Sequence, residues 1–241
     1  MKSIVSICLS LLFSGFANAA SVEEDVNRYA QAVDVDNYLH PDAVESLGWA
    51  GISDPRLFDS IERRVLEHAQ NSNNEDKEID AVDHYIEALG FSGQSKYAET
   101  LNKLLSDRRY QRHAKAALEN LPLYGKWNPI ISNRATFDPK NSDDVNRVLN
   151  MLHSNDFLLK RVGAKCVYFR NKDDVLLDAL ASEIRANYSS MDSSQIDSIA
   201  WMEKALGSAK QEKNRPVFDE VIANGKNLKV VDYAKKALAL K

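Results

Sequence analysis

Cysteine is nearly absent from this chain, which has two among 241 residues. Cys8 lies in an N-terminal apolar stretch, so Cys166 alone remains for the body of the protein. A fold held together by disulfides and a cysteine-rich metal site are therefore both excluded. Comparable positions elsewhere in the chain carry alanine, so we expect Cys166 to be a small, inert core thiol rather than a reactive nucleophile.

Long apolar runs are also scarce. The run from Ile4 to Phe16 follows Met1-Lys2-Ser3 and precedes Ala17-Asn18-Ala19. It is shorter than the roughly 20 residues that a membrane-spanning helix needs. The order of a charged start, an apolar middle and a small-x-small end is typical of a secretory signal peptide. We therefore expect a signal peptide over residues 1–19, cleaved after Ala19, no transmembrane segment, and export to the periplasm of a Gram-negative bacterium.

The motifs of common catalytic sites are missing. The chain has no Gly-x-Ser-x-Gly elbow, no glycine-rich phosphate loop after a strand, and no His-Glu-x-x-His. Asp80 and His84, one helical turn apart, are the local pair to consider as metal ligands, and a surface hydrogen bond is the commoner role of such a pair. The sequence therefore favours a protein that is not an enzyme, with no cofactor and no metal.

Neither sign of charge dominates. The chain has 31 Lys and Arg against 35 Asp and Glu, a net charge of −4. This mild acidity argues against general nucleic-acid binding, which depends on an excess of basic residues. Acidic pairs such as Asp143-Asp144 and Asp173-Asp174 stand at expected helix starts, where negative charge complements the helix dipole.

Helical periodicity is the main pattern that is present. Apolar residues recur at intervals of three and four, as in Leu57, Ile61 and Val65 or in Val145, Val148 and Leu152. No segment alternates apolar and polar residues in the manner of a strand. We therefore expect an all-α protein.

A short motif recurs where we expect a two-helix unit to end. The aligned leucine-type positions lie on average about 38 residues apart, close to the period of a two-helix repeat. We expect the glycines Gly48, Gly90, Gly207 and Gly225 to adopt the left-handed conformation that ends a helix. The six copies are Ser46-Leu47-Gly48, Ala88-Leu89-Gly90, Ala117-Leu118-Glu119, Cys166-Val167-Tyr168, Ala205-Leu206-Gly207 and Ala237-Leu238-Ala239.

These units resemble HEAT repeats, in particular the short HEAT-like repeats of exported bacterial proteins and of phycobilisome lyases. The clearest internal match sets Ala114, Ala117 and Leu118 against Ala234, Ala237 and Leu238 at one constant offset. The pairs Asp107 with Arg112 and Asp156 with Arg161 have the five-residue spacing of the family's Asp and Arg ladder between repeats. Asp83 and Asp232 depart from the pattern, because they occupy the arginine position in two units.

The resemblance implies a right-handed α-solenoid of about five to six helical hairpins. We expect an N-terminal capping helix within residues 20–40 and a repeat domain over residues 41–241. Three prolines and few periodic apolar residues between 121 and 142 predict an irregular break there.

Basic residues cluster where the second helices of the units are expected to begin. In HEAT-like proteins the second helices line the concave side, so the resemblance implies a broken positive stripe there, although solvated lysines are an alternative reading. The residues are Arg108, Arg109, Arg112, His113 and Lys115 in one unit, Lys160, Arg161 and Lys165 in another, and Lys226, Lys229, Lys235 and Lys236 in the last.

Two tryptophans are candidates for exposed anchors of a partner. Trp49 follows a helix-ending glycine, and Trp127 lies in the proline-rich segment, whereas Trp201 lies in a periodic run and is expected in the core. The leading hypothesis is a periplasmic scaffold that binds a protein or an anionic envelope component on its concave face.

The alternative is an enzyme or small-ligand chaperone of the lyase type. A small, deep, apolar pocket that holds His113 or His153 beside a carboxylate would favour it, and an open, shallow groove would favour the scaffold. The sequence leaves the oligomeric state open.

Overall fold

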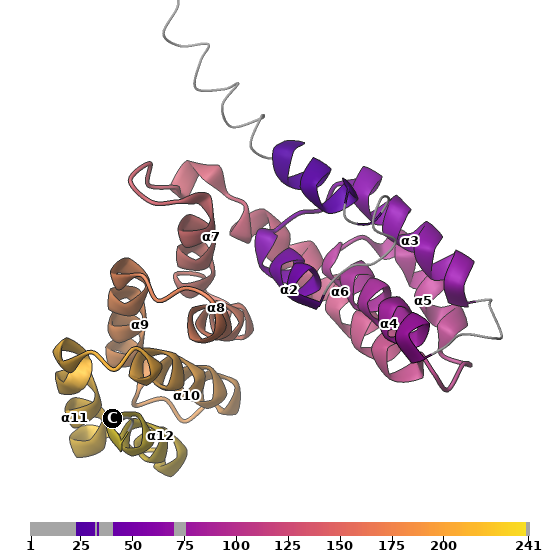
Figure 1. Ribbon diagram of the computed structural model, residues 1–241. Helices are drawn as coiled ribbons and strands as arrows, with labels where there is room; N and C mark the ends of the chain where they lie inside the picture. The colour runs from indigo at the N-terminus through magenta and orange to yellow at the C-terminus, as the bar shows by residue number, and fades with distance from the viewer. Residues whose placement is uncertain (1–22, 32, 34–40, 70–75, 240–241) are drawn as a thin grey trace, which may run out of the picture. The chain divides into compact units, whose positions relative to one another are not determined.

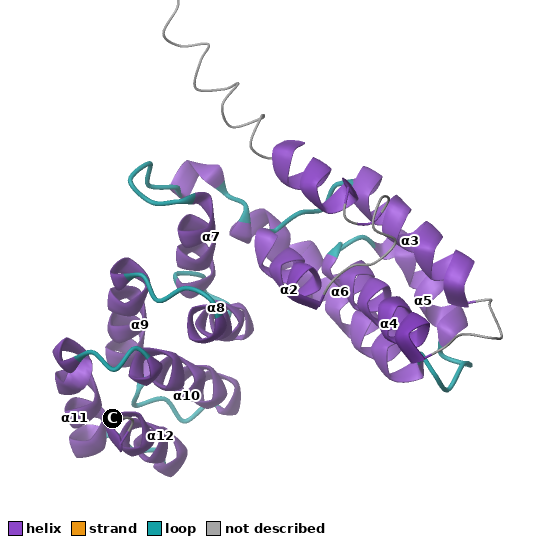
Figure 2. Cartoon of the chain, viewed as in Figure 1, coloured by secondary structure: helices purple, strands orange, loops and turns teal. Residues whose placement is uncertain are grey.

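The computed structural model describes residues 23–31, 33, 41–69 and 76–239 (Figure 1). Within these ranges every regular element is a helix, which confirms the predicted all-α class (Figure 2). The chain divides into two compact units, Met1–Asn128 (unit 1) and Pro129–Lys241 (unit 2). The predicted signal peptide lies outside the described residues. None of the described helices has the length and apolar composition that a membrane span requires.

Unit 1 begins, in its described part, with a helix over residues 23–31. Arg56 fixes this helix to the start of α3, because its guanidinium donates to both carboxylate oxygens of Glu23, each at 2.7 Å. The further helices are α2 (Pro41–Ala50), α3 (Pro55–Ala69), α4 (Asp76–Phe91), η1 (Ser95–Tyr97), α5 (Ala98–Leu104) and α6 (Gln111–Ile131).

The second helices of unit 1 pack on one another. Helix α4 contacts both α2 and α3, and Gly90 of α4 lies against Ala117 of α6. The buried amide of Asn128 in α6 donates to the carbonyls of Ile52, Phe91 and Ser92, at 3.2, 2.9 and 3.2 Å. This side chain therefore pairs buried backbone carbonyls at the ends of α2 and α4 and ties both ends to α6.

Unit 2 is a stack of three helical hairpins. The second helices α8, α10 and α12 pack each against the next, and the first helices α7, α9 and α11 form the opposite layer (Figure 1). This arrangement is that of an α-solenoid. The elements are η2 (Arg134–Thr136), α7 (Asp143–Leu152), α8 (Phe157–Phe169), α9 (Asp174–Asn187), α10 (Ser193–Ser208), η3 (Glu212–Asn214), α11 (Arg215–Asn224) and α12 (Leu228–Ala239).

Side-chain caps set where several of these helices begin. Ser142 accepts from the backbone N–H of Val145 at the start of α7. Asp156 and Asp192 each accept from two backbone N–H groups at the starts of α8 and α10. Such caps pair N–H groups that have no partner within the helix.

The predicted role of the repeated glycines is wrong. Gly90 and Gly207 lie inside helices, and Gly225 has a φ of −66°. The left-handed residues come three positions after Gly48, Gly90 and Gly207. They are Gly51 (φ 67°), Gly93 (φ 68°) and Lys210 (φ 53°).

The proline-rich segment is more helical than the sequence indicates. Helix α6 includes Pro122 and Pro129 and ends at Ile131. The irregular connection covers residues 132–142 and contains only the short helix η2.

Candidate functional site

A cluster of aromatic rings and lysines lies on the row of second helices in unit 2. We call it the aromatic–lysine surface, and it consists of Lys165, Tyr168 and Phe169 of α8 with Trp201 and Lys204 of α10. Residues three and four apart share one face of a helix. Because α8 and α10 pack side by side, the residues on α8 lie next to those on α10.

The three rings form one contiguous group. The centroids of Tyr168 and Trp201 are 6.1 Å apart with planes at 78°, and those of Phe169 and Trp201 are 6.4 Å apart. Tyr168 and Phe169 meet edge to face at 4.8 Å. Phe169 is 55% exposed, whereas Tyr168 and Trp201 are half-buried. The group therefore presents a large apolar side chain to solvent on a base of fixed rings.

Two ammonium groups flank Trp201. The Nζ atom of Lys204 lies 4.4 Å from the ring centroids of both Tyr168 and Trp201, and that of Lys165 lies 5.0 Å from the centroid of Trp201. Neither lysine forms an ion pair with any residue that the structure describes. A ring face attracts a cation by about 0.5–2 kcal/mol but leaves its charge uncompensated.

The environment of Lys165 disfavours its charged form. Burial lowers the pKa of Lys165, the positive charges of Arg161 and Lys204 lower it further, and Asp197 opposes them. Three cationic groups therefore repel one another on this surface, and a bound anion would relieve that repulsion.

A row of ion pairs, which we call the charge ladder, runs beside the aromatic–lysine surface across the second helices of three successive hairpins. Asp197 of α10 accepts from Arg161 of α8 at 2.8 Å and from Lys229 of α12 at 3.0 Å. The hydrogen bond from Arg161 is the main reason why the pKa of Asp197 is lowered. Of the expected ladder residues, Arg161 pairs with the next hairpin, whereas Asp156 accepts from backbone N–H groups at the start of α8.

Two predicted binding residues are buried. Lys160 is 7% exposed, pairs with Glu183 of α9, and lies over the Phe157 ring, so it is a structural ion pair and not part of a docking face. Trp127 is 4% exposed and packs edge to face on Tyr124 at 5.2 Å, so it is no exposed anchor. Because α6 continues through this segment, Trp127 falls on the helix face that packs into unit 1.

The prediction for Trp201 is wrong in the opposite direction, because this residue is more exposed than expected. The sequence predicts a core residue, and the structure places its ring half-exposed between two lysines. A signal existed in the sequence, because Lys204 follows Trp201 by one helical turn and Lys165 precedes Tyr168 by one turn. The contact between these two sets depends on the pairing of α8 with α10, which their local sequences do not show.

Several other predicted residues belong to unit 1. Arg109 is held by Asp107 at 2.6 Å and by the carbonyl of Ala69 at 3.3 Å, and its guanidinium lies 4.9 Å from the Tyr110 ring centroid. Trp49 is half-buried. The exposed members are Arg108, Arg109, Arg112 and Lys115.

His113 lies among carboxylates rather than in a basic stripe. Its Nε2 atom is 3.6 Å from Asp83 of α4. Burial raises the pKa values of Asp83 and Glu87, and the neighbouring imidazole of His113 opposes this in both. The described residues contain no cluster of three or more His, Cys, Asp or Glu placed to hold a metal ion.

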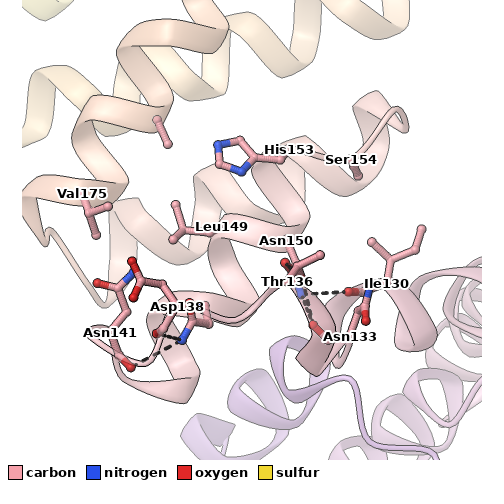
Figure 3. A pocket seen from close by; sticks show the side chains of 12 residues that line it. Ile130, Asn133, Thr136, Asp138, Asn141, Leu149, Asn150, His153, Ser154 and Val175 are labelled. Atoms are coloured by element: carbon pink, nitrogen blue, oxygen red, sulfur yellow. Dashed lines mark hydrogen bonds between the residues drawn. The ribbon is translucent and has the colours of Figure 1, made fainter.

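Unit 2 also has a cavity of about 530 Å³ between α7, α9 and the 132–142 connection (Figure 3). Its amides are occupied in holding the connection on α7. Asn146 exchanges hydrogen bonds with the backbone of Asp138, and Asn150 donates to the carbonyls of Ile130 and Ile131 and accepts from Thr136. The twelve lining residues are Ile130, Asn133, Thr136, Asp138, Asn141, Asn146, Leu149, Asn150, His153, Ser154, Val175 and Ala179.

The cavity has some, but not all, of the features expected of a ligand-holding site. His153 points toward it (Figure 3), and the carboxylate of Asp138 is also in its lining. The cavity is open to solvent, however, and His153 is exposed. A small, deep, apolar pocket is the predicted mark of an enzyme or ligand chaperone, and this cavity has a mainly apolar lining but lies open to solvent.

Glu203 of α10 is fully buried, and neither of its carboxylate oxygens has a hydrogen-bond partner. Burial raises the pKa of Glu203 to about 9, so this carboxyl is protonated at neutral pH. It cannot reach a ligand at the surface, and we assign it no role in binding.

No protein-family model matches the chain, and no curated protein is similar to it in sequence. Among solved structures, the chain is similar to human deoxyhypusine hydroxylase in complex with glycerol. The two chains are 14% identical, the match covers 89% of this chain and 83% of the other, and the TM-score is 0.38. A likeness this low carries no conclusion about activity.

Proposed function

We propose that this protein is a non-enzymatic scaffold of the periplasm that binds a protein or an anionic envelope component through the aromatic–lysine surface. The observation that carries the proposal is the pair of lysines, Lys165 and Lys204, that flank Trp201 without a carboxylate partner among the described residues. The stacked hairpins of unit 2 hold these side chains on two packed helices rather than on loops.

The composition of this surface is that of an interface. Tryptophan and tyrosine are enriched among the residues that dominate binding energies, because they bury a large area and lose little conformational freedom. Here the two rings are already fixed against each other and against lysines. An exposed phenylalanine beside them, Phe169, adds apolar area that a partner would cover.

A photo-reactive amino acid placed at position 169 tests the proposal. In intact cells it should cross-link to a discrete partner, which is then identified, purified and shown to bind the purified protein. The matched control places the same amino acid at position 191, because Met191 is 66% exposed in the same unit. Equal cross-linking of the same partner from both positions, or binding of the purified partner that is unaffected by Trp201→Ala, would overturn the proposal.

Cell fractionation tests the localisation. The full chain should appear in the periplasmic fraction, and a chain that lacks residues 1–19 should remain in the cytoplasm. Retention of the full chain in the cytoplasm would contradict export.

A further inference from the structure

We infer that the partner presents an acidic peptide segment that carries an aromatic or large aliphatic side chain. One of its carboxylates is bound between Lys165 and Lys204, and its apolar side chain covers Phe169. This inference rests on the proposed function and narrows the class of partner to protein.

The lysine pair supplies the anion-binding half of the site. Both ammonium groups lie against the same ring, at 5.0 and 4.4 Å from the centroid of Trp201. Each therefore has one side on the ring and keeps N–H donors for a ligand. The neighbouring carboxylate cannot serve them, because Asp197 is already shared by Arg161 and Lys229.

The charge balance of this face favours an anion. Its cations are Arg161, Lys165, Lys204 and Lys229, and Asp197 is the carboxylate that pairs with two of them. Arg161 and Lys204 both lower the pKa of Lys165, which is the direction that repulsion between neighbouring cations produces. A carboxylate at Lys165 and Lys204 would replace that repulsion by two charge-assisted hydrogen bonds.

Phe169 supplies the apolar half. It is the last residue of α8, is 55% exposed, and stands edge to face on Tyr168 at 4.8 Å. A further ring or aliphatic chain placed on its open side would extend an existing aromatic group. One short segment of a partner can therefore contact both Phe169 and the lysine pair.

A peptide fits these groups better than a polyanion does. Binding of a phosphate polymer strengthens with each phosphate that is neutralised, so it needs a long uninterrupted row of cations. Here Asp197 interrupts the row, and unit 2 as a whole has 18 Lys and Arg against 15 Asp and Glu. A phosphate polymer also has no apolar group to cover Phe169.

Fluorescence anisotropy with defined probes tests the inference on the full chain. The main probe is a fluorescein-labelled peptide of ten residues with two glutamates and one phenylalanine among glycine and serine. One control peptide replaces both glutamates by glutamine, and the other replaces phenylalanine by alanine. Inorganic polyphosphate and phosphatidylglycerol vesicles are the competing anions.

Binding of the acidic peptide should weaken at least tenfold with Lys204→Ala or Lys165→Ala, and severalfold with Phe169→Ala. Lys140→Ala is the matched control, because Lys140 is an exposed lysine of the same unit, and it should change nothing. Both control peptides should bind more weakly than the acidic peptide. The loss for the peptide without glutamate should match that of the lysine variants, and the loss for the peptide without phenylalanine should match that of Phe169→Ala. Circular dichroism of each variant establishes that it is folded.

Two outcomes would overturn the inference and leave the proposed function standing. One is no binding of the acidic peptide at millimolar concentration while the cross-link from position 169 persists. The other is tighter binding of polyphosphate or vesicles, lost with the lysine variants but unchanged by Phe169→Ala. Loss of the position-specific cross-link itself would instead remove the proposed function.

Discussion

Gly207 of α10 lies against Ala237 of α12 with no space for a side chain between them. A methyl group on Gly207 would lie 2.6 Å from the Cβ atom and 2.9 Å from the Cα atom of Ala237. Gly90 has the same relationship with Ala117 in unit 1, where a methyl group would lie 2.8 Å from the Cα atom of Ala117. The repeated Leu-Gly sequence therefore marks the place where one second helix packs on the next.

Gly207→Ala should destabilise the protein. The clash is with the Cβ atom and the backbone Cα atom of Ala237, so α10 and α12 must separate, at a cost of about 1–3 kcal/mol. The better helix propensity of alanine, worth about 1 kcal/mol, offsets only part of this cost. Chemical denaturation measures the difference, and Ala237→Gly should restore part of it by removing the nearer atom. A Gly207→Ala variant at least as stable as the natural protein would contradict the close contact.

Glu203 should make stability fall as pH rises. Its pKa is raised to about 9 in the fold from an ordinary value of 4.5. Between these two values the folded state binds a proton that the unfolded state releases, so the free energy of unfolding decreases with pH by up to about 1.4 kcal/mol per unit. Below a pH of 4.5 the carboxyl of Glu203 is protonated in both the folded and the unfolded state, so it no longer makes stability depend on pH.

Glu203→Gln removes this pH dependence, because the amide cannot ionise. Thermal unfolding of both proteins at pH 5, 7 and 9 should show melting temperatures that diverge as pH rises, with the variant the more stable at pH 9. Glu212→Gln, at an exposed position of the same unit, is the control and should follow the natural protein. Parallel curves for the natural protein and Glu203→Gln would show that the carboxyl is solvated.

The basic residues of unit 1 should matter less than the aromatic–lysine surface. Arg108 and Arg112 are exposed, and the described structure gives them no aromatic neighbour comparable to Trp201. Arg109 is unsuitable for a binding test, because its loss would also remove bonds to Asp107 and Ala69. Reversing the charge of Arg108 and Arg112 together should leave helicity unchanged and weaken partner binding by less than threefold in a purified binding assay. A larger loss would move the principal surface to unit 1.

The fold class could be predicted from the sequence because it depends on local information. Helical periodicity, capping residues such as Ser142, and the recurrence of Leu-Gly are all readable along the chain. The role of Gly90 and Gly207 was predicted wrongly, because a glycine near a helix end has two physical uses, a left-handed turn or a close approach of backbones. Choosing between them requires the partner helix.

The candidate surface was only partly predictable for the same reason. Lys165 and Arg161 stood out as basic residues of a second helix, but whether a lysine faces a carboxylate or an indole depends on the neighbouring hairpin. Lys160 meets Glu183 and is buried, whereas Lys165, five residues later, meets Trp201. Spacing along the sequence places both lysines on the same helix, but it does not indicate which residue of the neighbouring hairpin each of them contacts.

Calorimetric titration of the partner that cross-links to position 169 tests the central claim most directly. Two double variants are compared. The first combines Lys165→Glu with Lys204→Glu. The second combines Lys140→Glu with Lys226→Glu, at two exposed lysines of the same unit that lie outside the aromatic–lysine surface. Both variants change the net charge equally, so a general electrostatic effect would affect them alike. We expect the first to lose at least a hundredfold in affinity and the second to change by less than threefold. Equal affinities for the two variants would contradict the assignment of this surface.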